Sequence, residues 1–154
     1  MQEYINVRSS SEYRAAALLF SEYAKGLGID LGFQHFDAEL LSLERIYAAP
    51  EGGIILCRSG NEFIGCAGIR KIDEEKAELK RMYVQPAHQH KGIGKALLER
   101  SIILAKECKY AIIRLDTLRN MLPAIKLYKE YGFYEIAAYY HNPNPTTLYF
   151  EKQL

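Results

Sequence analysis

Two glycines, Gly92 and Gly94, stand where a predicted strand gives way to a predicted helix. Because glycine has no Cβ, the backbone at these positions can come close to a ligand. The first turn of a helix also has N–H groups without internal partners and the positive end of the helix dipole. Lys91 and Lys95 add positive charge beside the glycines. The segment therefore predicts an anion site suited to a diphosphate.

Two well-known phosphate-binding motifs do not fit this segment. A dinucleotide-binding G-x-G-x-x-G motif would require glycine in place of Leu97. A P-loop would require glycine in place of Gln89 and serine or threonine in place of Ala96. The pattern that remains is Gln89-x-x-Gly92-x-Gly94, placed between a strand and a helix.

The elements that position this loop are predicted from hydrophobic spacing and turn residues. Ser9 and Glu12 have the spacing of a capping box, and Gly26 or Gly28 would end the helix that follows. Antiparallel strands followed by a β-α-β unit predict a mixed sheet with helices packed on it. The predicted elements are, in order, a strand at 3–7, a helix after Ser9, a helix at 34–47, strands at 53–58, 62–72 and 76–84, a helix at 92–107, a strand at 111–116, a helix at 122–131, and strands at 133–139 and 147–152.

The pattern Gln89-x-x-Gly92-x-Gly94 resembles the acetyl-CoA loop of the GNAT superfamily of N-acetyltransferases. The stretch from Ala124 to Phe133, AIKLYKEYGF, is similar to the A-x-x-L-Y-x-x-x-G-F segment of the same family. The order of elements also matches, so the resemblance covers nearly the full chain, 1–154, as a single domain. It implies an α/β (α+β) fold with a mixed, mostly antiparallel sheet of six or seven strands. That sheet would be splayed at its centre and flanked by about four helices.

The resemblance also implies an enzyme that transfers an acetyl group from acetyl-CoA directly to a primary amine. A small-molecule or amino-acid-like amine is the expected acceptor, and a peptide or protein amine is the alternative. A non-catalytic acyl-CoA-binding module is the competing hypothesis from another functional class. The presence of both Glu78 and Tyr128, the two residues that the resemblance points to for catalysis, favours the enzyme.

The resemblance implies that the coenzyme contacts the loop, the start of the following helix and the strand before the loop. Backbone groups of Met82 and Val84 would pair with the pantetheine amides. Many members of the family also have a coenzyme-binding asparagine where this chain has Met121, so that contact stays unassigned. The remaining coenzyme-binding residues are expected to be Gln89, His90, Lys91, Gly92, Ile93, Gly94 and Lys95.

Two residues are candidates for proton transfer during the reaction. Tyr128 matches the family tyrosine that protonates the departing sulfur, and a phenol with a pKa near ~10 is protonated at neutral pH. Glu78 matches a strand glutamate that acts as general base in several relatives, and alternation would place it on one face with Lys80, Met82 and Val84. The alternatives are that Tyr128 is a core aromatic and that Glu78 pairs with Lys80 at the surface.

The resemblance implies that the acceptor enters between the first two helices and the loop that joins the last strands. Aromatic side chains with polar tips and a stiff Asn-Pro loop could line a small-molecule pocket there. The alternative is that the tyrosines of the last strands only pack in the core. The candidate substrate-binding residues are Phe36, Tyr139, Tyr140 and Asn142, and Phe33 and Tyr47 lie in the same region of the sequence.

Composition limits the remaining functions. A formal net charge of +1 over 154 residues argues against a nucleic-acid groove. No apolar run approaches the ~20 residues of a membrane helix, and no signal peptide is apparent, which favours a cytoplasmic protein without a membrane partner. The three cysteines are expected to be reduced, and His88 and His90 lack a third metal ligand nearby, so no metal is expected. Many relatives are dimers, which leaves a homodimer possible.

Overall fold

The computed structural model describes residues 1–154 with the exception of the Phe33 side chain. A seven-stranded sheet of order β1-β2-β3-β4-β5-β7-β6 forms its centre. Its elements are β1 Gln2–Asn6, α1 Ser10–Leu27, η1 Gly32–Gln34, α2 Phe36–Leu40, α3 Leu43–Ile46, β2 Gly53–Ser59, β3 Glu62–Lys71, β4 Lys76–Val84, η2 Pro86–His88, α4 Ile93–Glu107, β5 Ile112–Leu118, α5 Leu122–Glu130, β6 Tyr134–Ile136 and β7 Thr147–Gln153.

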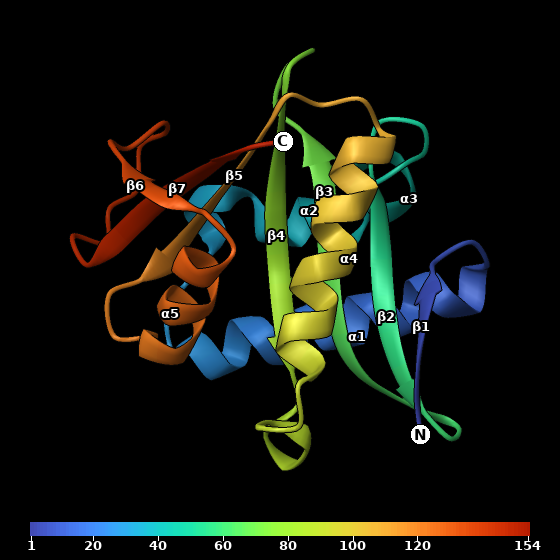
Figure 1. The fold of residues 1–154 in the computed structure, drawn as a ribbon. Coiled ribbons are helices and arrows are strands. Elements are labelled where there is room, and N and C mark those ends of the chain that lie inside the picture. Colours follow the sequence, from blue (N-terminus) through green and yellow to red (C-terminus); the bar gives the residue numbers. More distant parts are fainter.

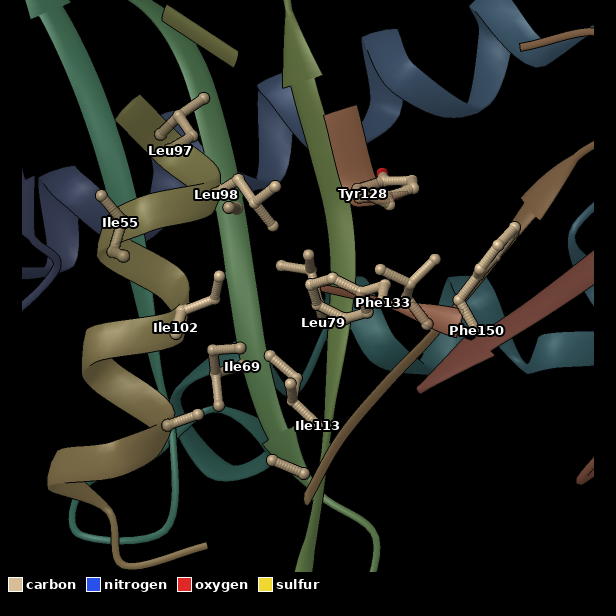
Figure 2. Close-up of a cluster of buried hydrophobic side chains, with 14 of the residues drawn as sticks. Ile55, Ile69, Leu79, Leu97, Leu98, Ile102, Ile113, Tyr128, Phe133 and Phe150 are labelled. Atoms are coloured by element: carbon tan, nitrogen blue, oxygen red, sulfur yellow. The ribbon is translucent and has the colours of Figure 1, made fainter. Parts of the chain in front are cut away.

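Helices cover both faces of the sheet. Helices α4 and α5 lie on one face and α1, α2 and α3 on the other (Figure 1). On the α4 face, Leu97, Leu98 and Ile102 pack against sheet residues that include Ile69 and Leu79 (Figure 2). The result is the mixed, mostly antiparallel sheet that the sequence predicts, with five α-helices in the described chain where about four were expected.

The first helix forms as its capping residues predict. The Ser9 side chain accepts a hydrogen bond from the Glu12 backbone N–H at 3.2 Å, and Glu12 Oε1 accepts one from the Ser9 backbone N–H at 3.0 Å. Gly28 ends the helix in the left-handed conformation, with φ of 67°. Strand β4 also has the predicted bounds, residues 76–84.

The helix predicted at 34–47 is wrong as a continuous element. His35 adopts a left-handed φ of 57°, so the chain forms the short η1 before it and α2 after it, and α3 begins only at Leu43. The break turns Glu39 inward, where its side chain accepts a hydrogen bond from the buried Tyr47 hydroxyl at 2.9 Å. The predicted strand at 133–139 is also too long, because β6 ends at Ile136 and leaves the following tyrosines in a loop.

The sheet is splayed at its only parallel strand pair in the described chain. Strands β4 and β5 pair over Lys76–Glu78 and Ile112–Arg114 alone, although both strands continue. Beyond this point β5 remains paired with β7, and β4 with β3. The two halves of the sheet therefore separate in the middle, as the resemblance implied. Among the described helices, none is long and apolar enough to span a bilayer.

Candidate active site

The glycine loop exposes a run of backbone N–H groups. No described residue accepts a hydrogen bond from the N–H groups of residues 90–95, and the first bond of α4 runs from the Ala96 N–H to the Gly92 carbonyl at 3.1 Å. His90 and Gly92 adopt left-handed φ angles of 65° and 81°. A Cβ placed on Gly92 or Gly94 would meet no atom within 4 Å, so the space beside these amides is open. These features fit a diphosphate.

The other predicted loop residues surround this run of amides. Gln89 donates from its side chain to the Val84 carbonyl at 3.1 Å, which ties the loop back to the end of β4. The side chains of His90, Lys91 and Lys95 are exposed, so their charges or donors are available at the rim. Ile93 is 2% exposed and anchors the first turn of α4 in the core. The structure thus brings these predicted coenzyme-binding residues together.

Tyr128 lies beside the place where β4 and β5 separate. A narrow hollow of about 20 Å³ occupies this place, and we call it the strand gap. Tyr128 is 6% exposed and packs near Phe133 and Phe150 (Figure 2). Burial raises the pKa of the Tyr128 hydroxyl, which therefore stays protonated at neutral pH. The strand gap is lined by Tyr23, Leu79, Lys80, Arg81, Met82, Leu115, Asp116, Thr117, Met121 and Tyr128.

The expected common face for Glu78, Lys80, Met82 and Val84 is wrong. Arg81 has a left-handed φ of 59°, and the pairing of β3 with β4 shifts register between Cys66 and Gly68. Such a bulge inserts one extra residue and reverses the alternation of side chains beyond it. Met82 and Val84 consequently pack toward the α4 face, while Glu78 and Lys80 contact residues on the opposite side.

Glu78 is enclosed by partners rather than exposed. Its side chain is 4% exposed, and one carboxylate oxygen lies 3.1 Å from Arg70 Nε. The other oxygen accepts a hydrogen bond from the Tyr139 hydroxyl at 2.5 Å and lies 4.0 Å from Lys80 Nζ. Burial, followed by the charge of Glu78, raises the pKa of Tyr139. A simple surface pair of Glu78 with Lys80 is therefore wrong.

A cavity opens next to Glu78, and we call it the Glu78 cavity. It holds about 350 Å³, a size within the range of small-molecule sites. Tyr139 and Tyr140, both predicted acceptor residues, form part of its wall, and Lys80 borders both this cavity and the strand gap. The cavity is lined by Gln34, His35, Arg70, Lys71, Ile72, Glu78, Lys80, Tyr139 and Tyr140.

The other predicted acceptor residues lie outside the wall of the Glu78 cavity. Phe36 is buried, and the Arg81 guanidinium stacks 5.0 Å from the centre of its ring. Asn142 lies behind the wall and donates to the Tyr140 hydroxyl at 3.1 Å. Tyr47 is fully enclosed in the core on the α1 side. The Phe33 side chain is outside the described part of the chain.

A polar network behind the cavity was not predicted from the sequence. The Tyr140 hydroxyl donates to Asp116 and accepts a hydrogen bond from the Gln34 side chain at 3.0 Å. The Gln34 carbonyl oxygen in turn accepts from Lys80 Nζ at 3.0 Å and from Arg81 Nη1 at 2.9 Å. The only local signal for this network was a group of charged residues within the otherwise strand-like sequence KAELKRMYV. The partners come from distant segments, which no local pattern could identify.

A buried ion pair completes the network. Arg81 Nη2 and Nε donate to the two carboxylate oxygens of Glu39 at 2.8 and 3.1 Å, and the two side chains are 3% and 2% exposed. Burial opposes ionisation of Glu39, but the hydrogen bond and charge of Arg81 lower the pKa of this carboxyl below its usual value. The pair fixes the bulge residue of β4 and, through Gln34, one wall of the Glu78 cavity.

Comparison with known proteins gives consistent matches. Residues 18–133 match the family model described as the acetyltransferase (GNAT) family. The chain is 34% identical over 139 residues to an uncharacterized N-acetyltransferase of Schizosaccharomyces pombe, a match that covers 89% of this chain and 85% of that protein.

Solved structures share the fold. An acetyltransferase from Streptococcus agalactiae superposes with a TM-score of 0.81 at 21% identity, covering 99% of this chain and 98% of that one. A GNAT family acetyltransferase from Elizabethkingia anophelis, solved with acetyl-CoA bound, gives a TM-score of 0.70 at 22% identity, with 99% and 98% covered.

Proposed function

This chain belongs to the acetyltransferase (GNAT) family, and we propose that it acetylates the primary amine of a small or amino-acid-like molecule. It is an acetyl-CoA-dependent acyltransferase, since its relatives are N-acetyltransferases and similar folds bind acetyl-CoA. The observation that supports a small acceptor is the size of the Glu78 cavity, about 350 Å³, and its position next to the strand gap at Lys80. A wide surface groove would suit a protein acceptor better.

Acetyl-CoA supplies an activated thioester. In the proposed arrangement, the free N–H groups of residues 90–95 hold the diphosphate, with Lys91 and Lys95 adding charge. Beyond Glu78, β5 no longer pairs with the edge of β4 that carries Met82 and Val84, so backbone groups on this edge can bind the pantetheine along the strand gap, although the Val84 carbonyl already accepts from Gln89. This path leads from the glycine loop to Tyr128 and toward Lys80, at the edge of the Glu78 cavity.

In this proposal, Tyr128 donates a proton during the reaction and Glu78 accepts one. The Tyr128 hydroxyl, kept protonated by burial, holds a proton that the departing sulfur requires. The Glu78 carboxylate is positioned by Arg70 and Tyr139 and accepts a proton from the acceptor ammonium. Because Tyr139 already donates to Glu78, the proton transfer from the acceptor uses a carboxylate whose orientation is fixed.

The role of Tyr128 is tested by replacing it with phenylalanine. We expect Tyr128→Phe to lower kcat by about 100-fold, the usual scale of general acid catalysis, with an unchanged Kd for acetyl-CoA. Tyr131→Phe is the matched control, because this tyrosine lies at the end of the same helix and donates to Glu99 at the surface. An unchanged kcat in Tyr128→Phe would remove the residue from the mechanism.

The acceptor class is tested by measuring thiol release from acetyl-CoA with a panel of small amines and peptides. We expect turnover with small amines and identify the product by mass spectrometry. Turnover with peptides alone would replace the small acceptor with a peptide N-terminus or lysine. Glu78→Gln should lower kcat/KM with every accepted amine by about 100-fold if the carboxylate is the general base.

A further inference from the structure

The Glu78 cavity has two chemically different ends. The pairing of β3 with β4 places Arg70 opposite Glu78 and Gly68 opposite Lys80, so Arg70 lies further from the splayed part of the sheet than Lys80 does. We call the end at Arg70 the outer end and the end at Lys80 and Tyr140 the inner end. The inner end adjoins the strand gap, which also reaches Asp116.

Arg70 supplies a cation at the outer end that forms an ion pair with Glu78 but donates no hydrogen bond to a described residue. Its Nε lies 3.1 Å from Glu78 Oε1, while no described residue accepts a hydrogen bond from any of its nitrogens. The side chain is 35% exposed and borders the cavity. A guanidinium with free N–H groups presents the planar fork that binds a carboxylate with two hydrogen bonds.

Lys80 supplies a second cation without a close carboxylate. Its side chain is 6% exposed, and its ammonium donates to the neutral Gln34 oxygen at 3.0 Å. The nearest carboxylate oxygen of Glu78 is 4.0 Å away and already accepts from Tyr139. Burial lowers the pKa of Lys80, as expected for an ammonium with incomplete compensation.

The remaining charged groups lie at the rim or behind the wall of the cavity. Lys71 is held at the rim by two exposed carboxylates, those of Glu51 and Glu74, at 2.7 and 2.5 Å, so these three side chains carry a net charge of −1 that water screens. Asp116 lies behind Tyr140 and borders the strand gap rather than the cavity. Among the residues that line the cavity, Arg70 and Lys80 therefore share the single carboxylate of Glu78, so the cavity wall itself has an excess of positive charge.

We propose that the acceptor is a primary amine that also carries a carboxylate, and that Arg70 binds this carboxylate at the outer end of the Glu78 cavity. The amine then points to the inner end, toward the strand gap and the thioester. This inference rests on the proposed function, and it gives that function a substrate class. Arg70 disfavours diamines and polyamines, because a second ammonium at the outer end would meet its guanidinium.

The test uses the full chain and matched acceptors. We compare kcat/KM for amino acids of increasing length with that for their carboxamides and for diamines of equal length, by thiol release. We expect the amino acids to be preferred, by about 10- to 100-fold for the best length, as for a charge-assisted pair. The amine of an α-amino amide is less basic than that of the acid, so intrinsic reactivity works against this preference.

Substitutions at Arg70 test whether this residue causes the preference for acceptors that carry a carboxylate. Because Arg70 also positions Glu78, Arg70→Gln should lower kcat for both acceptors, but it should raise KM for the preferred amino acid about 10- to 100-fold more than KM for its carboxamide. Arg70→Lys should restore part of this difference in KM. Lys71→Gln is the control, because this cation borders the same cavity but is bound by Glu51 and Glu74. An unchanged Kd for acetyl-CoA in each variant verifies that the protein is folded.

The outcomes separate this inference from the proposed function. Loss of the preference in Arg70→Gln, but not in Lys71→Gln, supports the carboxylate site. Equal or better turnover of carboxamides or diamines by the unaltered enzyme overturns the inference and leaves a small-amine acetyltransferase. A protein that binds acetyl-CoA but acetylates only peptides overturns both.

Discussion

The glycine loop, which we propose binds the coenzyme, and the Glu78 cavity, which we propose binds the acceptor, are built on different principles. The loop offers backbone N–H groups from one continuous segment, residues 90–95, and its charged side chains are exposed. The cavity is made of side chains from four separate segments, with charged groups such as Glu78 and Lys80 nearly buried. The loop therefore depends on local backbone conformation, whereas the cavity depends on ion pairs and hydrogen bonds between residues that are far apart in the sequence.

The largest effect is expected from loss of the buried ion pair between Arg81 and Glu39, behind the cavity. Arg81→Met leaves the buried Glu39 carboxylate without its cation, so we expect the free energy of unfolding to fall by about 3 kcal/mol. Urea denaturation measures this change. Arg58→Met is the control, because Arg58 pairs with Glu3 at 2.8 Å on the exposed edge of the sheet. That variant should lose less than about 1 kcal/mol.

The same ion pair predicts an acid dependence with a definite sign. The folded pKa of Glu39 is lowered from 4.5, so the pair stabilises the protein above this pH and the contribution is lost as the pH falls through the folded value. The difference in unfolding free energy between the unaltered protein and Arg81→Met should therefore shrink below about pH 4.5. A difference that stays constant to low pH would contradict an ionised Glu39.

The next largest effect concerns the backbone of the coenzyme loop. Gly92→Val introduces a side chain at a φ of 81°, so we expect the Kd for acetyl-CoA to rise by about 10- to 100-fold. Calorimetric titration measures this change. Gly60→Val is a matched control, since Gly60 has a φ of 61° and equally open surroundings in the turn between β2 and β3. Similar losses of affinity in both variants would mean that backbone strain anywhere in the fold weakens binding, and would contradict a direct role of the loop backbone in binding acetyl-CoA.

The smallest effect concerns the exposed charge of the loop. Lys95→Gln should raise the Kd for acetyl-CoA by only about 2- to 3-fold at low salt, because an exposed cation is screened by water and ions. The effect should disappear in about 0.5 M salt. A large effect that persists in salt would show that the loop relies on side-chain charge as the cavity does.

Most of the framework was predictable because it depends on short-range patterns. The capping box at Ser9, the bounds of β4 and the start of α4 after Gly92 all follow from local spacing. The break of the 34–47 helix was not predictable, because its apolar spacing is helical. His35 adopts a left-handed backbone conformation that interrupts the helix. Glu39 then pairs with Arg81, which lies forty-two residues later in the chain, and this tertiary contact overrides the local helical spacing.

The bulge at Arg81 shows the same limit within a correctly predicted strand. Period-2 alternation placed Glu78 with Met82, yet one extra residue in β4 sends them to opposite faces of the sheet. Nothing in the sequence KAELKRMYV marks Arg81 for a φ of 59°. The contacts with Glu39 and Gln34, which hold the arginine there, exist only in the folded chain.

By itself, the sequence determined the family, most of the order of the elements and the glycine loop between β4 and α4, because glycines, caps and periodic apolar residues act on their immediate neighbours. Only the tertiary structure decided the wall of the cavity that we propose for the acceptor. It joined Gln34, Arg70, Glu78 and Tyr139 into one wall and withdrew Phe36 into the core. Buried charges are stable only with partners at hydrogen-bonding distance, and in this chain those partners lie far apart in sequence.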